Sequence, residues 1–135
     1  MTENKNLNTL AESYNTDKLE HGYIKIYEKY FESIRDKNLK ILELGIADGK
    51  SLLMWSDYFK NSTVIGIDIH KIDIKEKNLD RHNIKVYQGS QSDDKFINEI
   101  IKEYGNFDIV IDDGSHLRKD VIKSFHLLFP HLNND

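Results

Sequence analysis

The sequence predicts an α/β protein with a Rossmann-like parallel sheet preceded by helices. Three observations predict this class. From about residue 40 onward, apolar stretches of strand length alternate with amphipathic stretches of helical period. A turn with two glycines follows the first of these strands. Acidic residues follow later strands, at the carboxyl ends where open α/β sheets bind ligands.

Length and composition narrow the possibilities further. The chain has 135 residues, the size of one ordinary domain, and a formal net charge of -4, which argues against nucleic acid as a partner. It has no cysteine, so disulfides, thiolate metal sites and cysteine nucleophiles are excluded. No apolar run reaches the roughly 18 residues of a membrane span, and the first residues lack the apolar core of a signal peptide. We therefore expect a cytoplasmic protein with no membrane partner.

Residues 1–38 are predicted to form an N-terminal helical segment. Apolar residues spaced i, i+3, i+4 and i+7 indicate a short helix from Leu7 to Tyr14. Turn-forming residues then predict a loop over 15–22, and a second apolar repeat predicts a helix from about Ile24 to Arg35. These helices are expected to lie across the edge of the sheet or to cover a site.

Residues 39–135 are predicted to form the Rossmann-like core, truncated after the helix that follows the fourth strand. Repeated strand and helix units of this kind form parallel sheets with right-handed crossovers. Strands are expected at 41–44, 63–68, 84–87 and 107–111. Helices are expected at about 50–58, 74–79, 96–104 and 121–129, the last of them stopped by Pro130.

The end of the sequence has a consequence for the sheet. Residues 131–135 form a polar turn of the kind that leads into another strand, and no strand follows. The strand at 107–111 is therefore expected to have an unpaired side, which favours aggregation in an isolated protein. Either a partner copy completes the sheet in a homo-oligomer, or the sequence is part of a longer chain; the second alternative is favoured.

The segment Glu43–Gly49 joins the first strand to a helix. A dinucleotide fingerprint needs glycine where Ala47 and Lys50 stand, so a pyrophosphate ligand is disfavoured. An acid before the first glycine, with a second glycine four residues later, suits a ligand with an amino-acid tail and an adenosine. Glu43, Gly45 and Ala47 are therefore predicted cofactor contacts. The alternative is a tight turn without a ligand.

The second and third strands end in further candidate contacts. Asp68 ends the second strand about 20 residues after the glycine turn, where a carboxylate can accept both hydroxyls of a ribose. Ile69, beside it, is assigned to the same cofactor site. After the third strand, Gly89, Ser90 and Gln91 supply polar groups for an adenine edge. For Ser92 and Asp93 the alternative is that they only cap the next helix.

The fourth strand ends in the run Asp112-Asp113-Gly114-Ser115-His116. Magnesium prefers oxygen ligands, and adjacent strand residues point in opposite directions, so one of the two carboxylates is expected to bind a metal. Asp112 is grouped with the predicted cofactor contacts. His116 is suited to accept a proton at neutral pH. The alternative is a surface histidine after an ordinary approach to a helix.

The sequence resembles a known family in these same segments. Residues 41–45, 48–52 and 65–68 resemble motifs I and II of class I S-adenosylmethionine-dependent methyltransferases. Residues 16–18, 21–23, 27–28 and 112–116 resemble, more narrowly, the metal-dependent sugar O-methyltransferases of the macrocin and mycinamicin type. The resemblance runs from about Leu10 to Pro130.

The resemblance implies roles for individual residues. Glu43 and Gly45 would border the methionine part of S-adenosylmethionine, and Asp68 would hold its ribose. Asp113 would bind Mg2+, and His116 would be the general base. The expected reaction transfers a methyl group to a hydroxyl of a sugar or glycosylated small molecule.

The same resemblance implies an incomplete site. The family's sheet has seven strands, and its other metal carboxylates follow the fifth, so the 135-residue chain is expected to be inactive alone. Two alternatives remain: a nicotinamide-dependent oxidoreductase, and a non-catalytic fragment that binds an adenosine cofactor.

Overall fold

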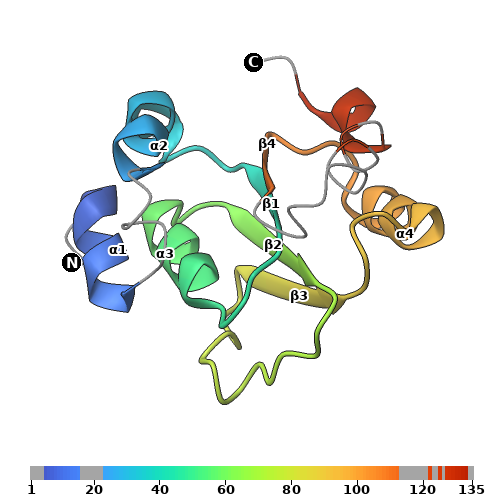
Figure 1. Cartoon of the computed structure of the whole chain (residues 1–135). Coiled ribbons are helices and arrows are strands. Elements are labelled where there is room, and N and C mark those ends of the chain that lie inside the picture. The colour runs from blue at the N-terminus through green and yellow to red at the C-terminus, as the bar shows by residue number, and fades with distance from the viewer. Residues whose placement is uncertain (1–4, 16–22, 113–121, 123–124, 126, 134–135) are drawn as a thin grey trace.

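The computed structural model describes residues 5–15, 23–112, 122, 125 and 127–133. Its centre is a four-stranded parallel sheet in the order β3-β2-β1-β4 (Figure 1). This confirms the predicted fold class, and the strand bounds agree with the expected ones to within two residues. The strands are β1 (Lys40–Leu44), β2 (Thr63–Asp68), β3 (Ile84–Gln88) and β4 (Ile109–Asp112).

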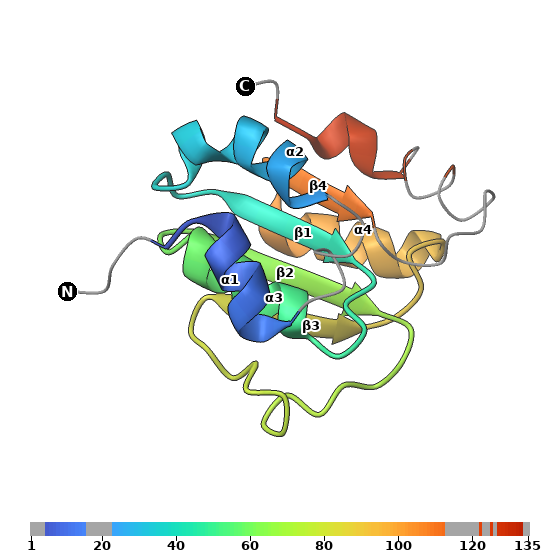
Figure 2. The ribbon, with the colours of Figure 1, turned by 60° about the vertical axis from the view of Figure 1, so that its left-hand side comes forward.

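Helices cover both faces of the sheet (Figure 2). One face carries α1 (Leu7–Tyr14), α2 (Tyr23–Phe31) and α3 (Lys50–Tyr58), and the other carries α4 (Asp94–Tyr104). Strand side chains alternate between the faces, so Ile41 packs with the first group, while Leu42 and Leu44 pack with α4. Burial on both faces explains the nearly continuous apolar residues of β2 and β4, whereas β3 exposes Lys85 and Gln88.

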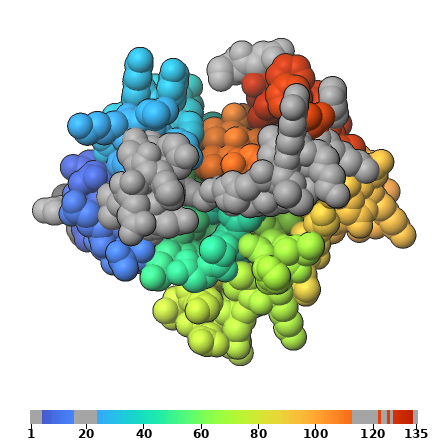
Figure 3. Space-filling view, in the orientation of Figure 1, coloured from blue at the N-terminus to red at the C-terminus, as the bar shows by residue number. Residues whose placement is uncertain are grey.

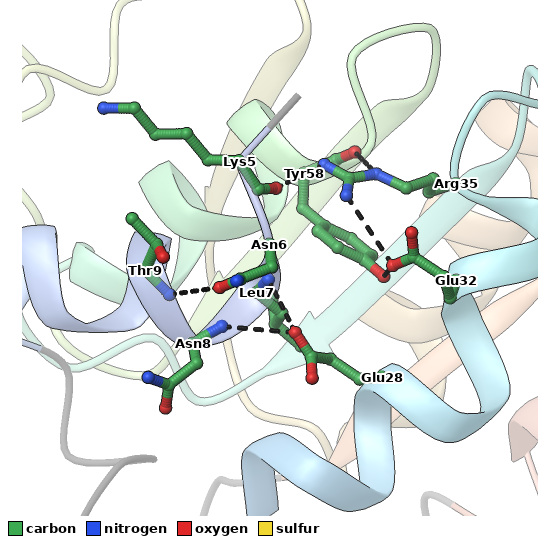
Figure 4. A network of polar contacts seen from close by, with 9 residues as sticks. All are labelled: Lys5, Asn6, Leu7, Asn8, Thr9, Glu28, Glu32, Arg35 and Tyr58. Atoms are coloured by element: carbon green, nitrogen blue, oxygen red, sulfur yellow. Dashed lines mark hydrogen bonds and ion pairs between the residues drawn. The ribbon is translucent and has the colours of Figure 1, made fainter. Parts of the chain in front are cut away.

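A polar network holds α1 against α2 (Figure 4). The Glu28 carboxylate of α2 accepts the backbone amides of Leu7 (2.9 Å) and Asn8 (3.4 Å) in the first turn of α1. Asn6 caps the same turn, since its side chain accepts the Thr9 amide at 2.7 Å. The amides that the helix leaves without an intrahelical partner are thus bonded to side chains.

Arg35 connects Lys5, which precedes α1, to the end of α3. Its guanidinium donates to the Lys5 carbonyl at 2.8 Å and to the Tyr58 carbonyl at 3.3 Å, and lies 3.8 Å from the centre of the Tyr58 ring (Figure 4). The Tyr58 hydroxyl donates to Glu32 at 2.7 Å. Residues of the N-terminal segment and of α3 therefore share one core.

Two helix predictions need correction. The helix expected to reach Arg35 ends at Phe31 and tightens into a 3-10 turn, η2 (Glu32–Ile34). The helix expected over 74–79 is wrong, because these residues form turns. The single turn that begins at Asp73 stops at Asn78, whose φ of 58° lies in the left-handed region and ends helical propagation.

The C-terminal segment also differs from expectation. The helical residues of this segment lead into η3 (Phe129–His131), so Pro130 lies within a 3-10 turn. Phe107 then donates its amide to the His131 carbonyl (2.7 Å) and accepts the Asn133 amide (2.8 Å), a parallel bridge to Leu132. Among the residues that the structure describes, β4 itself pairs with β1 alone. Figure 3 shows the orange segment that includes β4 at the surface between α2 and the C-terminal segment.

Across the described part of the chain, no helix has the length and apolar character that crossing a membrane requires.

Candidate cofactor site

The strand register brings the predicted cofactor residues to one edge of the sheet. Leu44 at the end of β1 pairs with Ile67 of β2 and with Asp112 of β4. Asp68 pairs with Gln88 at the end of β3. The segments that follow these strands therefore meet at the carboxyl edge, as the sequence predicts.

The glycine loop between β1 and α3 depends on left-handed backbone. Gly45 has a φ of 82° and Gly49, where α3 begins, a φ of 85°. Ala47 also has a positive φ, of 45°, although its Cβ disfavours that region. The loop thus takes a glycine-like conformation at the very position where the dinucleotide fingerprint has glycine.

Asp68 connects the end of β2 to this loop. It is 9% exposed, and its Oδ2 accepts the amides of Ile46 (2.9 Å) and Ala47 (3.1 Å). Its Oδ1 accepts the His70 amide at 2.8 Å. A carboxylate has about four acceptor positions, so the same group can also accept ribose hydroxyls. Ile69, beside it, is 63% exposed at this edge.

Glu43 is the most deeply buried of the predicted cofactor contacts. Its side chain points toward the face covered by α3, where Oε1 accepts the Ser51 hydroxyl and Oε2 accepts the Trp55 indole N–H at 2.9 Å. Glu43 is completely buried. Trp55 is also completely buried, and its hydrogen bond to Glu43 was not predicted from the sequence.

The loop after β3 lies against α4 and β4. The Gly89 amide donates to the Asp68 carbonyl at 2.9 Å, and a Cβ at Gly89 would lie 2.4 Å from the Phe96 ring. Gln91 is buried and donates to both carboxylate oxygens of Asp112, at 3.2 and 3.3 Å. Sequence reasoning assigned both residues to the site but did not foresee this contact between them.

The start of α4, the helix that follows this loop, shows whether Asp93 is a helix cap. The Asp93 side chain accepts the Phe96 amide at 3.3 Å and so caps α4. Ser90 and Ser92 lie within hydrogen-bonding distance of each other, with their hydroxyl oxygens 3.0 Å apart. The capping alternative is therefore confirmed for Asp93.

The predicted metal ligand and base, Asp113 and His116, lie outside the described residues. Asp112, the last residue of β4, is exposed at the carboxyl edge. Within residues 5–15, 23–112 and the described C-terminal positions, no three histidine or acidic side chains come together as a metal site. Asp112 is the acid nearest in sequence to the predicted metal ligand.

A comparison with protein families matches residues 21–134 to the model of the FtsJ-like methyltransferases. The chain belongs to the FtsJ-like methyltransferase family. An open α/β sheet with its glycine loop and Asp68 at one edge is thus a methyltransferase fold, which confirms the resemblance seen in motifs I and II. Membership of this family does not favour the oxidoreductase alternative.

A comparison with individual proteins finds relatives that are named for particular methyl-transfer reactions. Mycinamicin VI 2''-O-methyltransferase from Micromonospora griseorubida is 36% identical over 93% of this chain, and demethylmacrocin O-methyltransferase from Streptomyces fradiae has the same identity and coverage. The chain spans about a third (33%) of the length of either relative.

A solved methyltransferase shares the fold. MycE from the mycinamycin biosynthetic pathway, in complex with Mg, SAH and mycinamycin VI, superposes with a TM-score of 0.88 at 34% identity. The match covers 97% of this chain and 35% of MycE. The parallel sheet and its flanking helices therefore correspond to one portion of that larger enzyme.

Proposed function

We propose that this chain forms the cofactor-binding part of an S-adenosylmethionine-dependent O-methyltransferase that acts on a hydroxyl of a sugar or glycosylated small molecule. The proposal rests on one observation: in a methyltransferase fold, Asp68 accepts hydrogen bonds from the amides of the glycine loop, where the strands end. The relatives named above are O-methyltransferases of glycosylated compounds, and the MycE complex contains SAH, Mg and mycinamycin VI.

The residues at this edge fit such a cofactor. Gly45 and the exposed Ala47 leave the loop backbone open to close approach, as an amino-acid tail requires. Asp68 offers a carboxylate to the ribose, and the exposed Ile69 offers an apolar surface beside it. Gly89, Ser90 and Gln91 follow the neighbouring strand and suit the adenine edge. S-adenosylmethionine supplies an electrophilic methyl group on its sulfonium, and these residues would hold and orient it.

The acceptor hydroxyl needs a base, because a protonated alcohol is a poor nucleophile. We assign this role to His116, whose imidazole would take the hydroxyl proton as the methyl is transferred. Asp113 would hold Mg2+, which as a Lewis acid favours ionisation of a bound hydroxyl. Asp112, which is exposed and precedes Asp113 in the sequence, is assigned to the cofactor. A cytoplasmic location and a homo-oligomeric state stay predictions.

Calorimetry on the 135-residue chain tests the cofactor. We expect S-adenosylhomocysteine to bind and NAD to give no heat. Binding of NAD alone, or of neither compound, would contradict the proposal.

Activity assays on the complete natural polypeptide test the chemistry. With Mg2+ and a glycoside acceptor, His116→Ala should slow methyl transfer at least about 100-fold, the usual contribution of a general base. Asp113→Asn should raise the Mg2+ concentration needed for activity. Full activity of the first variant, or an unchanged Mg2+ titration of the second, would remove that residue from its role.

A further inference from the structure

Glu43 and Ser51 connect the two ends of the glycine loop. Glu43 lies two residues before Gly45, and Ser51 lies two residues after Gly49 in the first turn of α3. The Ser51 hydroxyl donates to Glu43 Oε1, so one carboxylate joins the strand that enters the loop to the helix that leaves it. The separation of the loop ends therefore depends on where this carboxylate lies.

Trp55 holds the other carboxylate oxygen. Its indole N–H donates to Glu43 Oε2 at 2.9 Å, one helical turn further along α3. Its ring contacts two aromatic rings of α2 edge-on, with centroid distances of 5.2 Å to Tyr27 and 5.9 Å to Phe31. The N-terminal helices thus reach the glycine loop through Trp55 and Glu43.

The Glu43 carboxylate is costly to bury unless it is hydrogen-bonded. Both Glu43 and Trp55 are completely buried, and Ser51 is 8% exposed. A buried carboxylate that loses a donor must move toward water or another donor, and the backbone of β1 and α3 would move with it. The start of α3 also favours a nearby negative charge.

We propose that Glu43 and Trp55 are positioning residues, which fix the glycine loop for the cofactor without touching it. This deepens the proposed function and rests on it. Glu43 has no exposed surface, whereas Asp68 is 9% exposed and Ala47 is exposed at the same edge. The N-terminal segment is then part of the frame of the cofactor site.

Two substitutions of Glu43 separate positioning from direct contact. Glu43→Gln keeps the size of the side chain, an acceptor for Trp55, and an amide that can donate to the Ser51 hydroxyl. Its affinity for S-adenosylhomocysteine should stay within about threefold of wild type, whereas Glu43→Ala should lose at least about tenfold. If the charge itself contacts the cofactor, both variants will lose affinity equally, and the proposal fails.

Trp55→Phe tests the indole donor, and Tyr58→Phe is its matched control. Each removes one hydrogen bond from a buried aromatic residue of α3 to a carboxylate, but Tyr58 bonds to Glu32, away from the loop. Both should lower the free energy of unfolding. In calorimetry, Trp55→Phe should weaken S-adenosylhomocysteine binding about tenfold, while Tyr58→Phe should leave it unchanged. Equal losses, or none, would overturn the role of Trp55.

A measurement without ligand separates this proposal from the proposed function. Amide hydrogen exchange over residues 45–50 should be faster in Trp55→Phe than in wild type, and unchanged in Tyr58→Phe. If wild type fails to bind S-adenosylhomocysteine, the proposed function fails, and the exchange rates still decide whether Trp55 fixes the loop. Unaltered exchange in Trp55→Phe would overturn the positioning proposal.

Discussion

The Asp68 carboxylate at the end of β2 accepts the Ile46 amide of the glycine loop at 2.9 Å. The same oxygen accepts the Ala47 amide at 3.1 Å. The residue expected to hold a ribose therefore also fixes the loop that would hold the methionine part. Both halves of the proposed cofactor site depend on one side chain.

Asp68→Asn should weaken cofactor binding and destabilise the fold together. An amide has one acceptor oxygen, so either the two loop amides or the His70 amide would face an N–H2 group. We expect a loss of about 1–3 kcal/mol in the free energy of unfolding and at least about tenfold in S-adenosylhomocysteine affinity. Urea denaturation and calorimetry measure the two effects.

Asp73→Asn is the control for that substitution. Asp73 also accepts a backbone amide, that of Glu76 at 3.1 Å, but within an exposed turn of the β2–β3 connection. Its affinity for S-adenosylhomocysteine should equal that of wild type. An equal loss in both variants would show that Asp68 has no special part in binding.

Gly49→Ala should destabilise the protein by at least about 1–2 kcal/mol, the usual cost of a left-handed conformation for a residue with a Cβ. Gly49 has a φ of 85°, and a Cβ there would lie 2.7 Å from Leu79 Cδ1. Ala47→Gly is the opposite change, at an exposed position with φ 45°, and should not destabilise. Thermal unfolding of both variants checks the expected order; a more stable Gly49→Ala would contradict the loop conformation.

Glu28→Ala should destabilise the first turn of α1 and leave the sheet unchanged. The carboxylate accepts the Leu7 and Asn8 amides, so its removal leaves the first turn of α1 without this cap. We expect a loss of about 0.5–2 kcal/mol, as for other caps, measured by urea denaturation. Glu12→Ala removes a bond only to the exposed side chain of Asn8 and should cost less. Equal stability of Glu28→Ala and wild type would argue against the cap.

Stability should fall in alkali, and Tyr58 should contribute to the fall. Burial, and then the hydrogen bond to Glu32, raise the pKa of Tyr58 above its ordinary value of 10.0. The native state therefore keeps the phenolic proton at a pH where the unfolded chain releases it. This stabilisation is complete below about pH 10 and is lost as the pH rises toward the native pKa.

Tyr58→Phe isolates this contribution. The variant lacks the titrating group, so its free energy of unfolding should fall less steeply above about pH 10, by up to about 1.4 kcal/mol per pH unit. Urea denaturation at about pH 8 and about pH 11 gives the two slopes. Parallel slopes for variant and wild type would rule out Tyr58 as a source of the alkaline loss.

Local patterns in the sequence were sufficient for most of the fold. Period-two and period-3.6 apolar patterns are imposed by burial of strand and helix faces, so they predicted the four strands, α1, α3 and α4. The apolar spacing over 74–79 failed because Asn78 takes a left-handed conformation and ends the turn.

The residues of the candidate site also divide into those whose placement the sequence predicted and those whose placement needed the folded structure. The sequence by itself determined that the glycine loop, Asp68, Gly89 to Gln91 and Asp112 would meet, because parallel strands bring their carboxyl ends to one edge. Only the tertiary structure decided which way Glu43 points, since that depends on α3 placing Ser51 and Trp55 against β1. The pairing of Leu132 with Phe107 likewise needed the folded chain, because strand pairing between distant residues leaves no local pattern.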